Sequence, residues 1–368
     1  MRNQNRRKGL HTVLGVCVAT ALLSVSTFSV AQEEEAEATT LPQLEQKFKK
    51  LRKRVKQLET EVGELRAKHE AVEFGVVVDC AAGDSINNVL QQYANESRRL
   101  NVFVDGTCTE AVVIERDNVI LSGGGVEGTV IQAPEAPMFS VNVTNGAHNV
   151  RIENLTLRGP HGAAVNKNAH AVFRNIVAEQ TNLAMVASDN GTMEITQATI
   201  RNSNVGVYAA RGGVALVSNS TIEQNVTGLL AFKGGTVNAT SVTPDGVGSD
   251  IVLVRNNTTG GVARSGGVLE LSDTTVTNNT GVGLLADTGS AIHFFNSMNG
   301  NNNFVVGNVG IGVSVQRTAA VVFNDASATI TGNSIGIFCA PNGSGYVAPS
   351  GPGTVTANRG ADILNCAP

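Results

Sequence analysis

From about residue 118 to the end, the chain consists of short runs of Val, Ile, Leu and Thr that are broken by Asn and Gly. Within these runs, positions suited to a core (Val, Ile, Leu, Ala) are interspersed with Ser, Thr and Asn, as in a strand whose two faces meet different surroundings. No amphipathic helical stretch longer than one or two turns is evident here. The pattern predicts an all-β region of many short strands.

These strands belong to a repeat of 20–32 residues. Each repeat has an apolar anchor, an Asn three positions later in most repeats, and then a Gly. The anchors are Leu157, Val177, Ile200, Ile222, Val254, Val276, Val305, Ile330 and Val355. The Asn residues are Asn225, Asn257, Asn279, Asn308, Asn333 and Asn358. The Gly residues are Gly206, Gly228, Gly260, Gly283, Gly312 and Gly336.

A period of this length built from strand-sized pieces is typical of a solenoid. Each rung, meaning one circuit of the solenoid, is expected to hold about three strands, so that equivalent residues stack about 4.8 Å apart. Asn is expected at a sharp bend because it tolerates the left-handed backbone region and can hydrogen-bond to its stacked copy. Gly is expected to supply positive φ. The L-x-x-L-x-L run of leucine-rich repeats and a six-residue period are both absent.

With these anchors, asparagines and glycines, the chain resembles the right-handed parallel β-helix, or pectin-lyase-like, repeat proteins of secreted bacterial origin, over roughly residues 75–368. The resemblance implies the fold, and it implies polysaccharide cleavage as an activity to test. The Asp-Asp, Gly-His-Gly and Arg-Ile-Lys motifs of polygalacturonases do not occur. Gly159-Pro160-His161-Gly162 resembles the Asp-Pro-His-Glu motif of mannuronan epimerases only at its centre and lacks both carboxylates, so His161 is expected in a surface turn. No catalytic residue is predicted.

Residues 75–110 are expected to form the N-terminal cap of the β-helix, and 111–368 its rungs. Val76–Cys80 reads as a strand, Asp84 and Ser85 can cap a short helix from Ile86, and Asn101–Cys108 can return as a strand. Of the five cysteines, Cys17 lies in the first 31 residues, which are expected to be removed as an export signal, and the other four fall in two local pairs. An even number in an exported chain suggests the disulfides Cys80–Cys108 and Cys339–Cys366. Free buried thiols remain an alternative. No CxxC motif or nearby His supports a metal site.

Residues 41–73 carry a heptad pattern whose a and d positions are mostly apolar, Phe48 among them, and predict an α-helical coiled coil before the β-helix. In a parallel pair, three of the four interhelical g–e′ contacts join opposite charges, and Lys47–Arg52 is repulsive. The alternative is a single amphipathic helix that lies on the β-helix. A homo-oligomer, dimer or trimer, is expected through the seam residues Leu44, Leu51, Val55, Leu58, Val62 and Leu65.

The first 31 residues predict an export signal. Arg2, Arg6, Arg7 and Lys8 precede an apolar run, and Ser29-Val30-Ala31 offers a cleavage site. An uncleaved anchor is the alternative; after cleavage no stable membrane span is expected. Residues 32–40 form a polar lead-in to the helix. The sequence therefore predicts an exported protein, periplasmic or extracellular.

Charge is concentrated in residues 32–74, which hold 9 basic and 10 acidic residues, whereas charged residues make up 16% of the whole chain. The net charge of −4 argues against nucleic-acid binding, and the absence of Trp argues mildly against a sugar-processing groove. A basic column of Arg211, Lys233, Arg264 and Arg317 is expected along one edge, flanked by Asp189 and Asp287. Such a column can bind an acidic glycan, or it can be a solvated row of turns whose charges pair.

A second column, Arg201, Glu223 and Arg255, is expected to form a surface ion ladder. The insertion Thr243–Asp250 could hold Ca²⁺ weakly through Asp245 and Asp250, but its spacing matches no calcium loop, and no cofactor is predicted. The sequence favours an exported structural or surface-binding β-helix protein. A polysaccharide lyase or hydrolase of the same fold is the alternative.

Overall fold

The computed structural model describes residues 41–240, 251–295, 303–324, 328–340, 346–350 and 354–366. The predicted export signal, the lead-in 32–40 and the insertion Thr243–Asp250 lie outside the described residues. The chain divides between His69 and Glu70 into two compact units, which are considered separately. In the described part, no helix is both long and apolar enough to cross a membrane.

Helix α2 (Leu41–Val72) accounts for the described part of the first unit and ends just inside the second. Its 32 residues correspond to about 48 Å at 1.5 Å per residue. The predicted seam is exposed on this helix: Phe48, Leu51, Val55, Leu58 and Val62 are 46–59% accessible. The side chains of Leu44 and Leu65 lie outside those described. The helix is confirmed, and pairing between chains stays a prediction.

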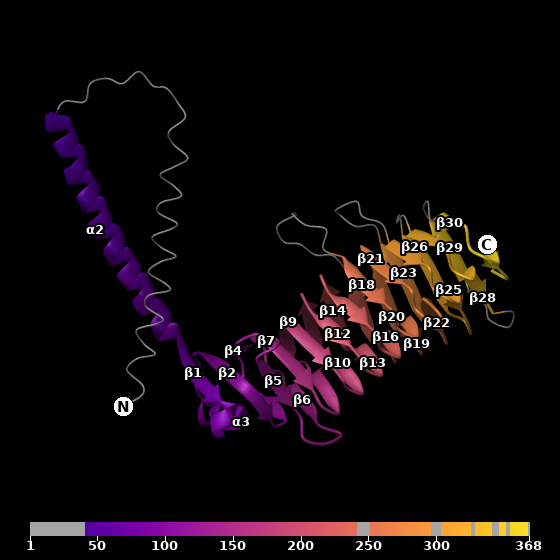
Figure 1. Ribbon diagram of the computed structural model, residues 1–368, viewed down its shortest axis with the longest axis horizontal. Coiled ribbons are helices and arrows are strands. Elements are labelled where there is room, and N and C mark those ends of the chain that lie inside the picture. The colour runs from indigo at the N-terminus through magenta and orange to yellow at the C-terminus, as the bar shows by residue number, and fades with distance from the viewer. Residues whose placement is uncertain are drawn as a thin grey trace. The chain divides into compact units, whose positions relative to one another are not determined.

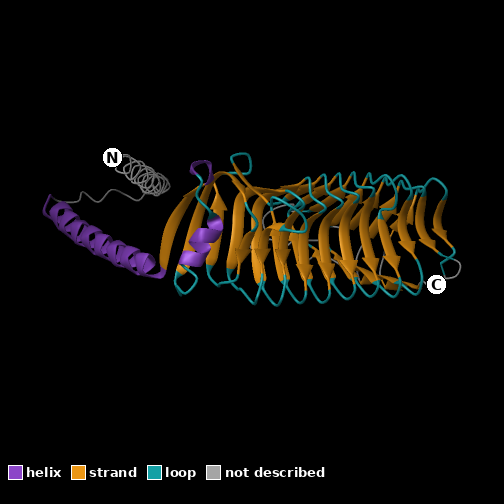
Figure 2. Ribbon diagram, turned by 90° about the horizontal axis from the view of Figure 1, so that it is seen from below, coloured by secondary structure: helices purple, strands orange, loops and turns teal. Residues whose placement is uncertain are grey.

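The second unit is a parallel β-solenoid whose strands follow one another rung by rung (Figures 1 and 2). One face is an eleven-stranded parallel sheet, here called sheet B. Its strands are β3 (Val112–Ile114), β6 (Phe139–Val143), β8 (His161–Val165), β10 (Leu183–Ser188), β13 (Val205–Ala210), β16 (Thr227–Phe232), β19 (Thr259–Arg264), β22 (Leu284–Asp287), β25 (Ile311–Val315), β28 (Ile335–Cys339) and β31 (Ala361–Leu364).

The other two faces are the two ladders of a twenty-stranded sheet. Three long strands cross from one ladder to the other and join them: β2 (Arg99–Thr109), β7 (Val150–Arg158) and β9 (His170–Glu179). The first ladder also holds β1 (Glu73–Asp79), β4 (Val119–Gly123), β11 (Thr192–Thr196), β14 (Val214–Ser218), β17 (Thr236–Ala239), β20 (Val268–Leu271), β23 (Ala291–Phe295), β26 (Ala320–Asn324) and β29 (Tyr346–Ser350). The second holds β5 (Thr129–Gln132), β12 (Thr199–Arg201), β15 (Thr221–Glu223), β18 (Val252–Arg255), β21 (Thr274–Thr277), β24 (Asn303–Val306), β27 (Ala328–Thr331) and β30 (Thr354–Thr356).

Eight of the nine predicted anchors stack in register along the second ladder and are the residues that face the core. The prediction was wrong for Val177, because its neighbour Ala178 pairs with both Leu157 and Ile200. Ala178 is fully buried, whereas Val177 lies on the outer face. The alternation of a strand sends adjacent residues to opposite faces, so an error of one position reverses the side chain's environment.

The six predicted Asn residues form a continuous ladder at the corner before sheet B. Side-chain amides bond from rung to rung, for example Asn279 Nδ2 to Asn308 Oδ1 at 2.8 Å. Oδ1 atoms of the ladder also accept hydrogen bonds from the backbone N–H groups of the preceding ladder Asn, as from Asn279 N to Asn308 Oδ1 and from Asn257 N to Asn279 Oδ1. The ladder is buried from Asn225 to Asn333. The stacking prediction is confirmed, but the left-handed residue precedes the ladder Asn, as at Gln224, Asn256 and Asn278.

The predicted reason for the corner glycines was also wrong. Gly228 does not have a positive φ; instead, a Cβ there would lie 2.5 Å from the Gly260 carbonyl oxygen and 2.9 Å from Val254 Cγ1 of the next rung. Gly206, Gly260, Gly283, Gly312 and Gly336 meet the next rung in the same way. Close packing between rungs, rather than backbone conformation, requires Gly at this position.

Both predicted disulfides are present, one near each end of the solenoid: Cys80–Cys108 and Cys339–Cys366. The first joins the 3-10 helix η1 (Cys80–Ala82) to β2. Helix α3 (Ile86–Gln92) follows, N-capped by Ser85 as predicted, and it buries Ile86 and Leu90 in the core. The predicted entry strands correspond to β1 and β2, which pair in parallel.

Candidate functional site

The charged edge follows the end of sheet B, where each strand turns into the next face. Lys167, Asp189, Arg211, Lys233 and Arg317 occupy left-handed positions in these turns. Arg264 and Asp287 lie one position earlier, because Arg264 is in register with Phe232 and with Asp287. The predicted single column is therefore wrong in detail. It consists of two adjacent columns, with Ser265 and Thr288 in the places assigned to Arg264 and Asp287.

Most of the basic side chains along this edge are already engaged by carboxylates. Arg211 bonds Asp189 through Nε at 2.6 Å and Nη2 at 2.9 Å. Hydrogen bonding to Arg211 holds the pKa of the Asp189 carboxyl below its ordinary value. Lys233 instead lies over the Phe232 ring, 5.1 Å from its centroid.

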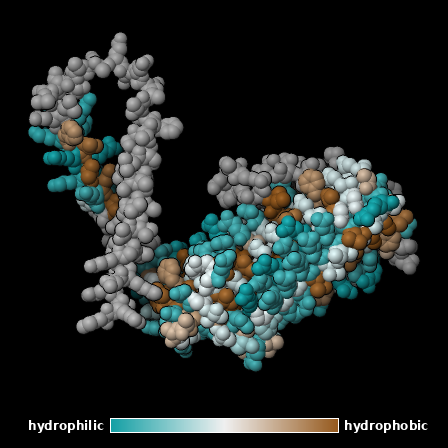
Figure 3. All heavy atoms as spheres, viewed as in Figure 1, coloured by the Kyte–Doolittle hydropathy of each residue, from teal (hydrophilic) through white to brown (hydrophobic). Residues whose placement is uncertain are grey.

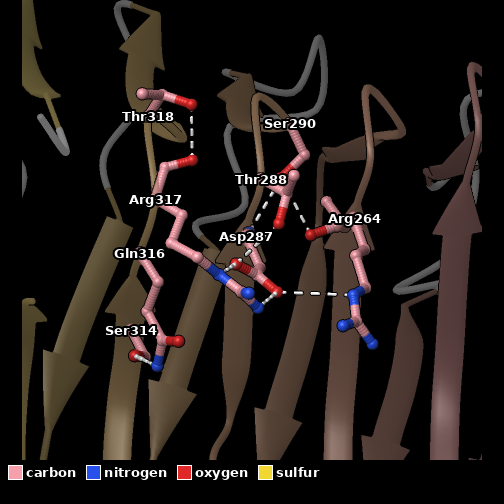
Figure 4. A network of polar contacts seen from close by, with 9 residues as sticks. Arg264, Asp287, Thr288, Ser290, Ser314, Gln316, Arg317 and Thr318 are labelled. Atoms are coloured by element: carbon pink, nitrogen blue, oxygen red, sulfur yellow. Dashed lines mark hydrogen bonds and ion pairs between the residues drawn. The ribbon is translucent and has the colours of Figure 1, made fainter. Parts of the chain in front are cut away.

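Asp287 is the centre of a second network, shown in Figure 4. Arg317 Nε donates to its Oδ1 at 2.6 Å, and Arg264 Nε lies 3.4 Å from its Oδ2. The Thr288 hydroxyl also donates a hydrogen bond to Asp287 Oδ1, and Ser290 Oγ accepts one from the Asp287 backbone N–H. The Asp287 side chain is only 5% exposed, and the hydrogen bonds from Arg317 lower its pKa despite that burial.

A groove of about 540 Å³ lies over the N-terminal strands of sheet B, beside this edge. Strands β3, β6, β8, β10 and β13 and the turns after them supply its lining, which includes Phe139, Leu183, Val186 and Tyr208, with Glu115, Lys167, Asp189 and Arg211 at the polar side. Of the predicted basic column, only Arg211 lines the groove. Burial raises the pKa of the Tyr208 phenol, which therefore remains a hydrogen-bond donor at neutral pH.

Lys167, Tyr208 and Phe139 were not predicted as site residues. Lys167 lies 22 residues before Asp189, and extending the charged column by one repeat would have found it. Tyr208 and Phe139 had no such signal, because only the register between rungs shows that they face outward on the same sheet.

The second charged column forms an ion ladder, as expected, in which Arg255 pairs with Glu223 of the predicted set and Arg201 pairs with Glu179 outside it. Arg158 and Arg201 both bond the buried Glu179, with Nε–Oε distances of 2.8 and 2.9 Å, and Arg255 bonds Glu223 at 2.9 Å. Glu179 was missing from the prediction because of the one-residue shift at Val177. These pairs bind successive rungs to one another.

His161 packs against Phe139, with ring centroids 4.9 Å apart, and burial lowers its pKa. It opens strand β8 rather than lying in a surface turn, so that expectation was wrong. The one grouping of potential metal ligands in the described residues is Cys80, Cys108 and Glu110. The two sulfurs form a disulfide and Glu110 accepts from Ile86 N at 2.7 Å, so this grouping is structural.

Comparison with protein families identifies residues 140–297 as a right-handed β-helix region. Among solved structures, two A-modules of mannuronan C-5 epimerases from Azotobacter vinelandii are similar at 13% identity. That of AlgE4 has a TM-score of 0.47, with 76% of this chain and 91% of that chain covered; that of AlgE6 has 0.45, with 77% and 94%. An alginate lyase from Paenibacillus sp. str. FPU-7 has a TM-score of 0.39 at 12% identity, with 79% and 99% covered. No curated protein matches the chain. The predicted fold, a right-handed parallel β-helix, is confirmed.

Proposed function

We propose that this right-handed β-helix protein is an exported, oligomeric binding protein, and that the groove over β6, β10 and β13 binds an acidic polysaccharide. One observation carries the proposal: the groove combines the cations Lys167 and Arg211 with the rings of Phe139 and Tyr208. Cations attract carboxylates, and flat rings offer an apolar surface to the C–H faces of sugars.

The groove runs along the solenoid axis across several rungs, so a linear polymer can lie in it. Lys167 and Arg211 lie two rungs apart on the charged edge, and Phe139 and Tyr208 come from strands separated by two others of sheet B. Neighbouring rungs are about 4.8 Å apart, so the site spans several sugar units along the solenoid. The charged edge continues beyond the groove with Lys233, Arg264 and Arg317. Arg264 and Arg317 are expected to contribute less to ligand binding, because both already pair with Asp287.

Arg211 is held ready for a ligand by its pairing with Asp189. The carboxylate uses Nε and Nη2, which leaves Nη1 free of that pair, and the side chain is 62% exposed. Asp189 therefore orients Arg211 and leaves its Nη1 available to an acidic ligand.

A lyase or hydrolase is the second candidate, because Tyr208 lies beside cations in a groove that contains two carboxylates. A tyrosine that abstracts a proton must itself be deprotonated, and burial raises the pKa of Tyr208. The protonated phenol supports binding better than proton abstraction.

Binding can be tested by calorimetric titration of the protein with oligogalacturonate. We expect Tyr208→Ala and Lys167→Gln each to weaken binding about tenfold, which corresponds to 1.4 kcal/mol. The matched control is Phe338→Ala, which removes an aromatic ring from the same outward column of sheet B beyond the groove. Equal affinities for Tyr208→Ala and the wild type would overturn the proposed site. New unsaturated or reducing ends in incubated acidic polysaccharides would favour the enzymatic candidate.

The oligomer is proposed from α2, where a row of exposed apolar residues follows a heptad spacing. In water such a row is stabilised by burial against another helix, and a second copy supplies an identical one. Export is proposed from the two disulfides, which form and persist in oxidising compartments.

A further inference from the structure

Helix α2 contains a basic segment, residues 47–56, which lies outside the compact unit that forms the solenoid. Seven of its ten residues are basic and none is acidic: Lys47, Lys49, Lys50, Arg52, Lys53, Arg54 and Lys56. All seven are exposed. At 1.5 Å per residue they lie within about 15 Å of helix, the highest density of positive charge in the chain.

Within the part of the chain that the structure describes, none of these seven cations pairs with a carboxylate. Among the side chains described on α2, residues 46–62, there is no ion pair, and the side-chain to side-chain hydrogen bond found there joins Gln57 to Glu61. Pairs four residues apart are of like charge, as at Lys49–Lys53 and Lys50–Arg54, and such pairs destabilise a helix. In the solenoid, by contrast, Arg158, Arg201, Arg211, Arg255, Arg264 and Arg317 all contact carboxylates.

The placement of the cations around the helix indicates the shape of the partner. With about 100° between successive residues, Phe48, Leu51 and Val55 share one narrow face, and the seven cations cover the remaining arc of roughly 220°. A flat membrane touching the apolar face would leave cations such as Lys49 and Lys53 pointing away from it. A linear polyanion can follow the helix around and meet them all.

The apolar seam also distinguishes between kinds of polyanion. It runs through the basic segment, so paired helices stay together there and do not fork across a DNA groove as basic zipper regions do. The segment's one aromatic residue, Phe48, belongs to that seam, and so no ring is available on which bases could stack. A polysaccharide with carboxylates requires neither a fork nor stacking.

We propose that the basic segment Lys47–Lys56 of α2 is a second binding site, for a linear carboxylated polysaccharide. In an oligomer the segments of two or three chains come together, which multiplies the charge and adds the Lys47–Arg52 repulsion between chains. The bound polyanion neutralises both and so stabilises the assembled helices. The ligand class is that of the proposed function, but the residues are different, so either site can fail without the other.

The test compares variants of the full chain for polygalacturonate binding at several salt concentrations. Lys49, Lys50, Lys53 and Lys56, all outside the seam, are changed together to Gln. We expect affinity at low salt to fall at least tenfold and its salt dependence to flatten, because fewer counterions are released. A charge-matched control changes four exposed arginines of the solenoid to Gln: Arg98, Arg151, Arg174 and Arg359.

Replacing the same four lysines by Arg is expected to preserve binding, and helix content and oligomer size are measured for every variant. Loss of binding with the helix and oligomer intact supports the site, as does a rise in the helix melting temperature when polygalacturonate is added to the wild type. Wild-type affinity in the four-Gln variant overturns it. Tighter binding to duplex DNA or to phosphatidylglycerol vesicles than to polygalacturonate overturns the polysaccharide assignment. Tyr208→Ala, measured in parallel, reports on the groove alone.

Discussion

At the scale of single residues, the solenoid depends on how closely neighbouring rungs approach. At Gly228 a Cβ would come within 2.5 Å of a backbone oxygen of the next rung, and backbone cannot move aside as a flexible side chain can. Six successive rungs, from Gly206 to Gly336, carry this contact, so the glycines at the corner specify the spacing of the stack there rather than its flexibility.

Gly228→Ala is therefore expected to destabilise the protein by about 1–3 kcal/mol, the usual range for overpacking. Urea unfolding monitored by circular dichroism gives the measurement. Gly128→Ala is the control, because a Cβ at Gly128 meets no heavy atom within 4 Å. Identical unfolding midpoints for the two variants would contradict the close-approach argument.

The pairing of Asp287 makes stability depend on pH. Its pKa in the folded state lies below the ordinary value of 3.8, mainly through the hydrogen bonds from Arg317. A group of this kind contributes stability that is fully present above its unfolded pKa and is lost as the pH falls through its folded pKa.

We expect Asp287→Asn to cost roughly 1–3 kcal/mol at pH 7, since it removes hydrogen bonds to a buried charge. Below the folded-state pKa of Asp287, which itself lies under 3.8, the variant and the wild type should converge, because the wild-type carboxyl is then protonated as well. Asp189→Asn is a useful comparison, since Asp189 also pairs with an arginine but is 44% exposed, and a smaller loss is expected. Parallel pH profiles for Asp287→Asn and the wild type would count against this account.

At the scale of elements, each strand contacts mainly its counterparts in the adjacent rungs, so the ends of the solenoid can open without the middle. The last rung, which includes β31, is covered by a neighbour on one side only within the described residues. Ile363, on β31, is 55% exposed. The Cys339–Cys366 disulfide joins β28 to the segment after β31 and holds this end together.

Replacing Cys339 and Cys366 by Ser is expected to loosen the last rungs by about 3 kcal/mol, from the chain entropy of a loop of this length. In a solenoid the effect should stay local. Hydrogen exchange should accelerate in β28 and β31 and remain unchanged in β10 and β13. The corresponding Cys80→Ser and Cys108→Ser variant should instead affect β1 and β2, and a uniform acceleration in either variant would argue against local stabilisation.

At the scale of the whole molecule, helix α2 carries an exposed heptad seam, and the visible face of the solenoid carries a hydrophilic area interspersed with pale and hydrophobic patches (Figure 3). The seam is thus the surface on which assembly is expected. Leu51→Asp with Leu58→Asp should convert the oligomer to a monomer of 38.2 kDa or less, because each buried charge lacks a partner. Multi-angle light scattering measures the mass.

Thr60→Asp serves as the control for assembly, since it adds a negative charge to α2 outside the seam. It should leave the oligomer intact. If the wild-type chain is monomeric at micromolar concentration, the proposed coiled coil is contradicted. The argument that assembly multiplies the positive charge of the basic segment would then fail as well.

The sequence alone was enough for the architecture. Repeated anchors, a periodic Asn and paired cysteines each report a local requirement that recurs in every rung or at each end, and repetition makes such a signal visible. The register, the groove and the charge pairing were decided only by the tertiary structure. A one-residue shift in the assumed repeat, as at Val177 and Arg264, exchanges inward and outward faces or moves a charge to the next column. Residues such as Phe139, Lys167 and Tyr208 line one groove only when successive rungs stack, because equivalent residues of neighbouring rungs lie 22 residues apart along the chain and one strand spacing apart in space.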